Sequence, residues 1–105
     1  MIVTTTEPPY YAVIFTSERT EVEDGYGQMS EYMAALALQQ PGYLGHESAR
    51  EGLGITISYW DSLEAIKNWK QHSEHLIAQD KGISQWYTHY KTRICKVERD
   101  YDFHK

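Results

Sequence analysis

Hydrophobic positions along the chain follow two different spacings, and each change of spacing marks a change from strand to helix or back. Residues 10–17 include aromatic and β-branched side chains with no glycine or proline among them, which is typical of a strand. Side chains at 11, 13 and 15 point to one face of this strand, and those at 10, 12 and 14 to the other. Because both sets are apolar, we expect both faces of the sheet to be covered.

From Gly25 to Gln40 the hydrophobic residues recur every three or four positions, which predicts an amphipathic helix. Asp24 is the expected N-cap, because its carboxylate can accept hydrogen bonds from the free N–H groups of a first helical turn. The pair Pro41-Gly42 then ends the helix.

Three further strands are predicted after this break. Residues 43–50 and 54–60 are separated only by a short turn at Glu51-Gly52, so they form an antiparallel hairpin. Residues 86–99 form the last strand, and a polar tail follows it.

A second helical region lies between the hairpin and the last strand. Asp61 or Ser62 caps a helix that runs through Trp69 to about residue 71. A further helical piece over 73–84 is expected to continue it after a bend, with Ser73 as a local cap.

The order strand, helix, strand, strand, helix, strand predicts an α+β, ferredoxin-like βαββαβ fold. Its four-stranded antiparallel sheet carries both helices on one face. Residues 10–105 make one domain, and residues 1–9, which close in Pro8-Pro9, are expected to be a flexible arm. Two helices cover only one face of the apolar sheet, so a second copy is the simplest cover for the other, and we predict a homodimer.

Composition narrows the classes of partner. The net charge is −5 without a basic cluster, which argues against nucleic acid and anionic membranes as partners. No apolar run approaches the length of a membrane span. A single cysteine, Cys95, fits a reducing compartment and predicts a cytoplasmic protein. Nine tyrosines and three tryptophans suit the half-buried walls of pockets and subunit contacts.

Candidate chemistry is concentrated on the second helical region. Trp69, His72, Leu76 and Gln79 lie three or four residues apart and share one stripe of an unbroken helix, with His75 close to it. A histidine titrates near neutrality, so His72, and after it His75, are the candidate catalytic bases. A histidine on an apolar stripe is more often a core or interface residue, and this alternative stays open.

Three other chemistries are less favoured by the residue pattern. His72 and His75 lack a third ligand at suitable spacing, so no metal site is predicted. Cys95 lies inside a strand and is expected to be a small buried hydrophobe. Alternating His89, Lys91 and Arg93 form either an anion-binding face or a solvated one.

Five segments carry a family likeness: residues 41–48 (PGYLGHES), 57–66 (ISYWDSLEAI), 69–75 (WKQHSEH), 86–87 (WY) and 97–101 (VERDY). Through them the chain, from residue 10 to residue 101, resembles the antibiotic biosynthesis monooxygenase superfamily of dimeric α+β barrel proteins. The part from Trp60 to Trp69 is similar to its small bacterial members. The resemblance implies a homodimer with a barrel-like core and a cavity between sheet and helices in each subunit.

The same resemblance implies a monooxygenase that needs no cofactor and oxidises a small phenol- or quinol-type aromatic with O2. His72 is then the expected base, and Trp69, Tyr59, Trp86 and Gln79 contact the substrate. The alternative from another class is a dimeric ligand-binding or stress-related protein without catalysis. Fold alone does not decide between them.

Haem binding or degradation is a third and less favoured reading. The haem-degrading branch pairs a tryptophan, matched here by Trp69, with an iron-binding histidine ten residues later. Position 79 is glutamine, and residues 10–17 contain no asparagine, which that branch also uses. The haem-binding pattern is therefore incomplete, and no cofactor is predicted.

Overall fold

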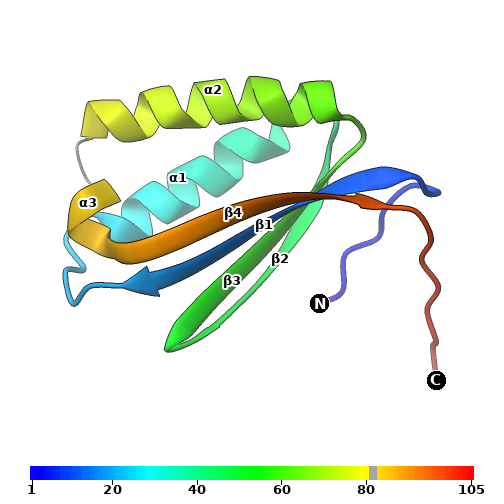
Figure 1. The fold of residues 1–105 in the computed structure, drawn as a ribbon, viewed down its shortest axis with the longest axis horizontal. Helices are drawn as coiled ribbons and strands as arrows, with labels where there is room; N and C mark the ends of the chain where they lie inside the picture. Colours follow the sequence, from blue (N-terminus) through cyan, green and yellow to red (C-terminus); the bar gives the residue numbers. More distant parts are fainter. Residues whose placement is uncertain (81–82) are drawn as a thin grey trace.

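Two long helices lie on one side of a four-stranded antiparallel sheet (Figure 1). The computed structural model describes residues 1–80 and 83–105, and the side chains of all of these except 75, 77–80 and 83. The elements follow the predicted order and are β1 (Tyr10–Arg19), α1 (Tyr26–Leu38), β2 (Tyr43–Glu51), β3 (Leu53–Trp60), α2 (Leu63–Asp80), α3 (Ile83–Trp86) and β4 (Tyr87–Val97). The strands lie in the order β2-β3-β1-β4, which confirms the ferredoxin-like α+β fold. No described helix is long and apolar enough to cross a membrane.

The start of α1 differs from the prediction. Its N-cap is Gly25, at φ 78°, and no side chain caps it, so the expected cap at Asp24 is wrong. The backbone carbonyl of Asp24 instead accepts a hydrogen bond from the indole nitrogen of Trp86 at 2.9 Å. The backbone just before this helix is therefore held by a residue 62 positions away in the chain.

The second helix, α2, is continuous where a bend was predicted, and it is therefore longer than expected. Ser62 caps it, because its Oγ accepts the backbone N–H of Ala65 at 3.1 Å. The helix then continues unbroken through Ser73, whose Oγ donates to the carbonyl of Lys70 at 3.1 Å within the same helix. Ser73 is thus no local cap. The following turn, α3, includes Trp86, so the last strand begins at residue 87 and not at 86.

Alternation along the strands gives the sheet two different faces. The helix-facing side carries Trp60, which is fully buried and stacks on Trp69 of α2. The opposite side, called the open face below, carries Leu53 and Ile55, which are 49% and 40% exposed. Cys95 lies on the open face and is exposed, so in this single chain it is not the buried hydrophobe that was expected.

Polar contacts tie both ends of the chain to the open face. The N–H of Val3 donates to Glu47 Oε2 at 3.0 Å, and the Tyr59 hydroxyl donates to Oε1 at 2.7 Å. These two bonds hold the pKa of Glu47 below its ordinary value. Burial, followed by the bond to Glu47, raises the pKa of Tyr59 to about 12. At the other chain end, Asp100 Oδ2 accepts the Tyr10 hydroxyl at 2.5 Å. Flexibility of residues 1–9 stays a prediction.

We expect Gly42→Ala to destabilise the fold by at least about 2 kcal/mol. Gly42 has φ 85°, and an added Cβ would collide with the carboxylate of Asp61 and lie 2.7 Å from the Cβ of Ala65, where β3 passes into α2. Gly52→Ala is the matched control, because Gly52 has φ 78° but open space around it. It should cost only about 1 kcal/mol, measured by urea unfolding at one protein concentration. Equal losses would contradict the packing argument.

The stabilisation that Glu47 contributes to the fold should be lost at low pH. Its pKa is lowered by folding, so its contribution is complete above the ordinary value of 4.5 and is lost as pH falls through the lowered folded value. Glu47→Gln should lower the free energy of unfolding by about 1 kcal/mol at pH 7, and the difference should shrink below pH 4. Urea unfolding between pH 3 and pH 7 tests this, with Glu51→Gln as the control for charge. A difference that stays constant with pH would argue against the bond.

Candidate functional site

Three aromatic side chains form a stack between the sheet and α2. The rings of Trp60 and Trp69 lie 6.0 Å apart at an interplanar angle of 28°, and the His72 ring lies 5.9 Å from that of Trp69. Trp60 ends β3, and its indole nitrogen donates to Ser58 Oγ at 2.9 Å, so its one polar atom is satisfied although it is fully buried. The structure therefore brings the predicted base and the predicted aromatic wall, Trp69, together.

His72 lies at the edge of the buried stripe of α2. Ile66 is buried, and Trp69, Ser73 and Leu76 are half-buried, which defines the face that α2 turns toward the sheet. His72 is three residues from Trp69 and falls beside this stripe, so its ring is exposed while it contacts the indole. In a single chain the imidazole is thus accessible from solvent.

A second histidine joins the same stack from the edge strand β2. Tyr43 lies edge-on to Trp60 at 5.2 Å between ring centres, and its hydroxyl lies 2.5 Å from Nδ1 of His46. Burial raises the pKa of Tyr43, so its hydroxyl stays protonated. The prediction missed this pair because an irregular register at Gly45, with φ 140°, brings positions 43 and 46 to one face.

Other predicted site residues are not brought to this stack. Tyr59 is next to Trp60 in β3, so it points to the open face and does not line the space beneath the helices. Trp86 lies beside the end of β1 that is farther from Trp60, where it contacts Tyr26 at 5.8 Å between ring centres. The side chains of His75 and Gln79 lie outside the described residues.

A second aromatic cluster occupies the far end of the helix-facing side. Tyr87 lies 5.7 Å from Phe15, 5.9 Å from Tyr26 and 5.8 Å from Tyr90, measured between ring centres. Burial, followed by a hydrogen bond with the Tyr26 hydroxyl, raises the pKa of Tyr87. No motif predicted this cluster, because its members come from β1, α1 and β4.

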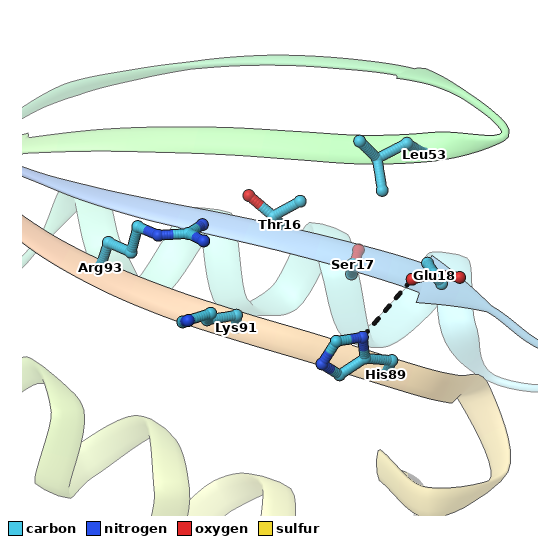
Figure 2. Close-up of a pocket in the computed structure, with 7 residues that line it drawn as sticks. All are labelled: Thr16, Ser17, Glu18, Leu53, His89, Lys91 and Arg93. Atoms are coloured by element: carbon cyan, nitrogen blue, oxygen red, sulfur yellow. Dashed lines mark hydrogen bonds and ion pairs between the residues drawn. The ribbon is translucent and has the colours of Figure 1, made fainter.

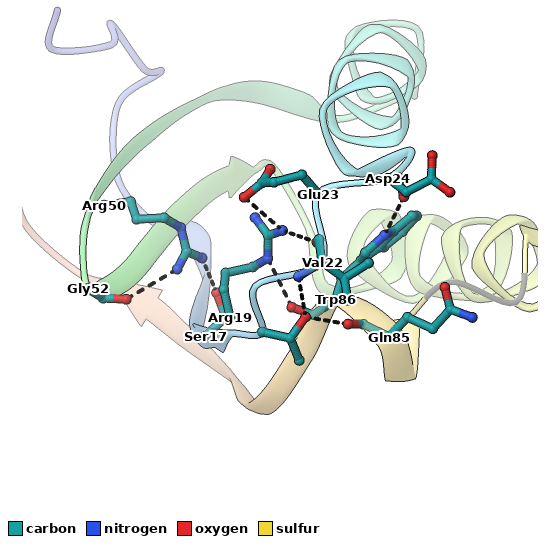
Figure 3. Close-up of polar contacts among 10 residues, drawn as sticks. Ser17, Arg19, Val22, Glu23, Asp24, Arg50, Gly52, Gln85 and Trp86 are labelled. Carbon is teal, nitrogen blue, oxygen red and sulfur yellow. Dashed lines mark hydrogen bonds and ion pairs between the residues drawn. The ribbon is translucent and has the colours of Figure 1, made fainter.

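Two arginines, whose polar contacts are drawn in Figure 3, lie near the second cluster. The guanidinium of Arg19 lies 3.2 Å from the centre of the Tyr26 ring, and its Nε donates to the carbonyl of Trp86 at 2.9 Å. Arg50 Nη2 donates to Ser17 Oγ at 2.5 Å. Arg19 joins the end of β1 to the start of β4, whereas Arg50 reaches across the sheet from β2.

A shallow hollow of about 110 Å3 lies mainly on the open face (Figure 2). Its polar lining includes Lys91 and Arg93 of β4, and His89 Nδ1 lies 3.4 Å from Glu18 Oε1. Ligand sites usually exceed about 300 Å3, so in one chain this hollow is too small for an aromatic substrate. Within the described part of the chain, no three histidine, cysteine, aspartate or glutamate side chains are grouped to hold a metal ion.

Comparison with solved structures supports the fold. SnoaB, a cofactor-independent oxygenase from Streptomyces nogalater, is 12% identical with a TM-score of 0.71, over 89% of this chain and 97% of SnoaB. PA3566 from Pseudomonas aeruginosa is 16% identical with a TM-score of 0.67, over 91% of this chain and 99% of PA3566. At such identities these likenesses show the fold alone.

Sequence comparison goes further. The uncharacterized protein YqjZ of Bacillus subtilis (strain 168) is 56% identical over 97 residues, which cover 90% of this chain and 85% of YqjZ. The family described as antibiotic biosynthesis monooxygenase matches residues 10–81, which include the β3–α2 unit with Trp60, Trp69 and His72. On this match the chain belongs to the antibiotic biosynthesis monooxygenase family.

Proposed function

We propose that this protein is a cofactor-independent monooxygenase that oxidises a small phenol- or quinol-type aromatic with O2. The observation that carries the proposal is the stack of Trp60, Trp69 and His72, which puts an imidazole beside a flat apolar surface. Family membership supports a monooxygenase in general. The similar fold of SnoaB, a cofactor-independent oxygenase, is consistent with chemistry in which the substrate itself reduces O2.

In this proposal His72 removes the hydroxyl proton of the substrate. The resulting phenolate is rich enough in electrons to reduce O2 by one electron, and the two radicals combine into a carbon-bound peroxide. When the O–O bond breaks, one oxygen atom stays as a carbonyl and the other leaves as water, taking up the two hydrogens that the substrate loses. Trp69 holds the ring next to His72 and keeps water from one side of the peroxide.

A homodimer is part of the proposal. Both long helices lie on one side of the sheet (Figure 1). On the other side, the open face, Leu53 and Ile55 are exposed. A second copy packed on this face would bury these side chains. We also propose the cytoplasm as the compartment, because the exposed Cys95 thiol persists in a reducing environment.

Loss of the base should remove most of the activity. With a panel of quinols and anthrone-type phenols in an oxygen electrode, His72→Ala should consume O2 about 100- to 10,000-fold more slowly than the wild type. His104→Ala, in the exposed tail, is the control and should keep the wild-type rate.

Equal rates in wild type and His72→Ala would reject His72 as the base. If the wild type consumes no oxygen with any member of the panel, the oxygenase proposal fails. Binding of these compounds without oxygen uptake would support the alternative of a non-catalytic ligand-binding protein.

A charge on the open face should dissociate the dimer. Ile55→Glu places a carboxylate in the centre of the proposed interface, so sedimentation velocity should show a monomer where the wild type is a dimer. Leu63→Glu is the matched control, because Leu63 is 55% exposed but begins α2 on the other side of the sheet. A monomeric wild type at micromolar concentration would contradict the proposal.

A further inference from the structure

One row of residues crosses the helix-facing side of the sheet from edge to edge. Arg50 of β2 lies opposite Gly54 of β3. Gly54 in turn lies opposite Ser17 of β1, which lies opposite Tyr90 of β4. Gly54 lies six positions before Trp60 along β3, an even spacing, so the row points to the same side as Trp60. The two central residues, Gly54 and Ser17, are small, whereas the end residues, Arg50 and Tyr90, are large. The row therefore has a depression at its centre.

The guanidinium of Arg50 lies in this depression. Its Nη2 donates to Ser17 Oγ at 2.5 Å, and its Nη1 donates to the carbonyl of Gly52 at 3.4 Å (Figure 3). An added Cβ on Gly54 would collide with the guanidinium, so glycine at this position lets the group lie flat on β3. Ser17 is only 2% exposed, whereas Arg50 is exposed. One side of the guanidinium is thus anchored in the interior, and solvent reaches the residue from the other.

The charge of Arg50 is not neutralised within the described residues. Arg19 lies 3.6 Å from the carboxylate of Glu23, but no described carboxylate lies within ion-pair distance of Arg50. Its two acceptors, a hydroxyl and a backbone carbonyl, are both neutral. A guanidinium has five N–H donors in one plane, so donors remain for an anionic oxygen.

An exposed aromatic surface adjoins this cation. Tyr90 is 46% exposed, and its ring lies 5.3 Å from that of Phe15 at an interplanar angle of 34°. The positive charge of Arg50 also reaches the Tyr87 hydroxyl, where it opposes the rise in the pKa of Tyr87. The guanidinium and the rings of Phe15, Tyr87 and Tyr90 therefore belong to one neighbourhood.

We propose that this row is a binding site for an aromatic carboxylate, with the ring on Tyr90 and Phe15 and the carboxylate on Arg50. A planar fork of N–H donors matches the two oxygens of a carboxylate, and the aromatic rings match the flat body of the ligand. The site lies about 20 Å along β3 from Trp60, at roughly 3.3 Å per residue, so it is separate from the stack that holds His72. It stands whether or not the protein is an oxygenase.

The test is a titration of 15N-labelled protein with 2-naphthoate, followed by amide chemical shifts. We expect the shifts to centre on Ser17, Gly54 and Tyr90. Methyl 2-naphthoate, which keeps the ring but lacks the charge, should bind at least about tenfold more weakly, as should 2-naphthoate to Arg50→Ala. Arg50→Lys should also weaken binding, because an ammonium group lacks the planar fork.

A second variant separates the position of the guanidinium from its charge. Gly54→Ala keeps Arg50 but displaces its guanidinium, so it should lose affinity for 2-naphthoate while the net charge is unchanged. Arg99→Ala, in the exposed tail, removes one positive charge elsewhere and should bind as the wild type does. The proposal is overturned if Arg50→Ala retains wild-type affinity, if the methyl ester binds equally well, or if the shifts centre on Trp60 and Trp69. Absence of binding to the wild type at millimolar 2-naphthoate also overturns it.

Discussion

Burial of Trp60 is the constraint on which the arrangement of this protein depends. Trp60 is the last residue of β3. Its indole packs edge-to-face with Tyr43 of β2 and stacks on Trp69 of α2, so one side chain joins three elements. A fully buried tryptophan contributes a few kcal/mol through the hydrophobic effect, and its ring leaves little freedom to the helix above it. The position of His72 follows, because that residue lies one turn beyond Trp69 on a continuous helix.

The helix-facing side has two chemically different ends, and their separation organises the functional proposals. One end carries Trp60, Trp69 and two histidines, the residue type that most often serves as a general acid or base in enzymes. The other carries a cluster of tyrosines beside the guanidinium groups of Arg19 and Arg50. The proposals therefore assign proton abstraction to the first end and recognition of a carboxylate to the second.

Local patterns were sufficient to predict the order of the elements. The strand and helix spacings, the break at Pro41-Gly42 and the cap at Ser62 all depend on neighbouring residues, and all appear in the structure. The predictions that failed concern positions where residues far apart in the sequence are in contact. The hydrogen bond from Trp86 to the carbonyl of Asp24 lies at the start of α1, and no pattern near residue 24 reveals it.

The candidate site was predictable to the same degree and for the same reason. Trp69 and His72 share one helix, so their spacing alone predicted that they would meet. Tyr59 was assigned to the wrong face because consecutive residues of a strand point in opposite directions, and only the packing of Trp60 on α2 shows which of the two faces inward. The contact of His46 with Tyr43 was not predicted, because the irregular register at Gly45 becomes visible only in the paired strands.

Charge distribution on the open face restricts how a second copy can cover it. Leu53 and Ile55 of β3 favour burial, whereas Lys91 and Arg93 of β4 lie on the same face and would cost several kcal/mol each if they were buried without partners. Val3 already covers the sheet at Gly45, where an added side chain would collide with it. An interface centred on β3 would leave the basic residues at its rim, where they remain solvated or meet carboxylates of a chain whose net charge is −5.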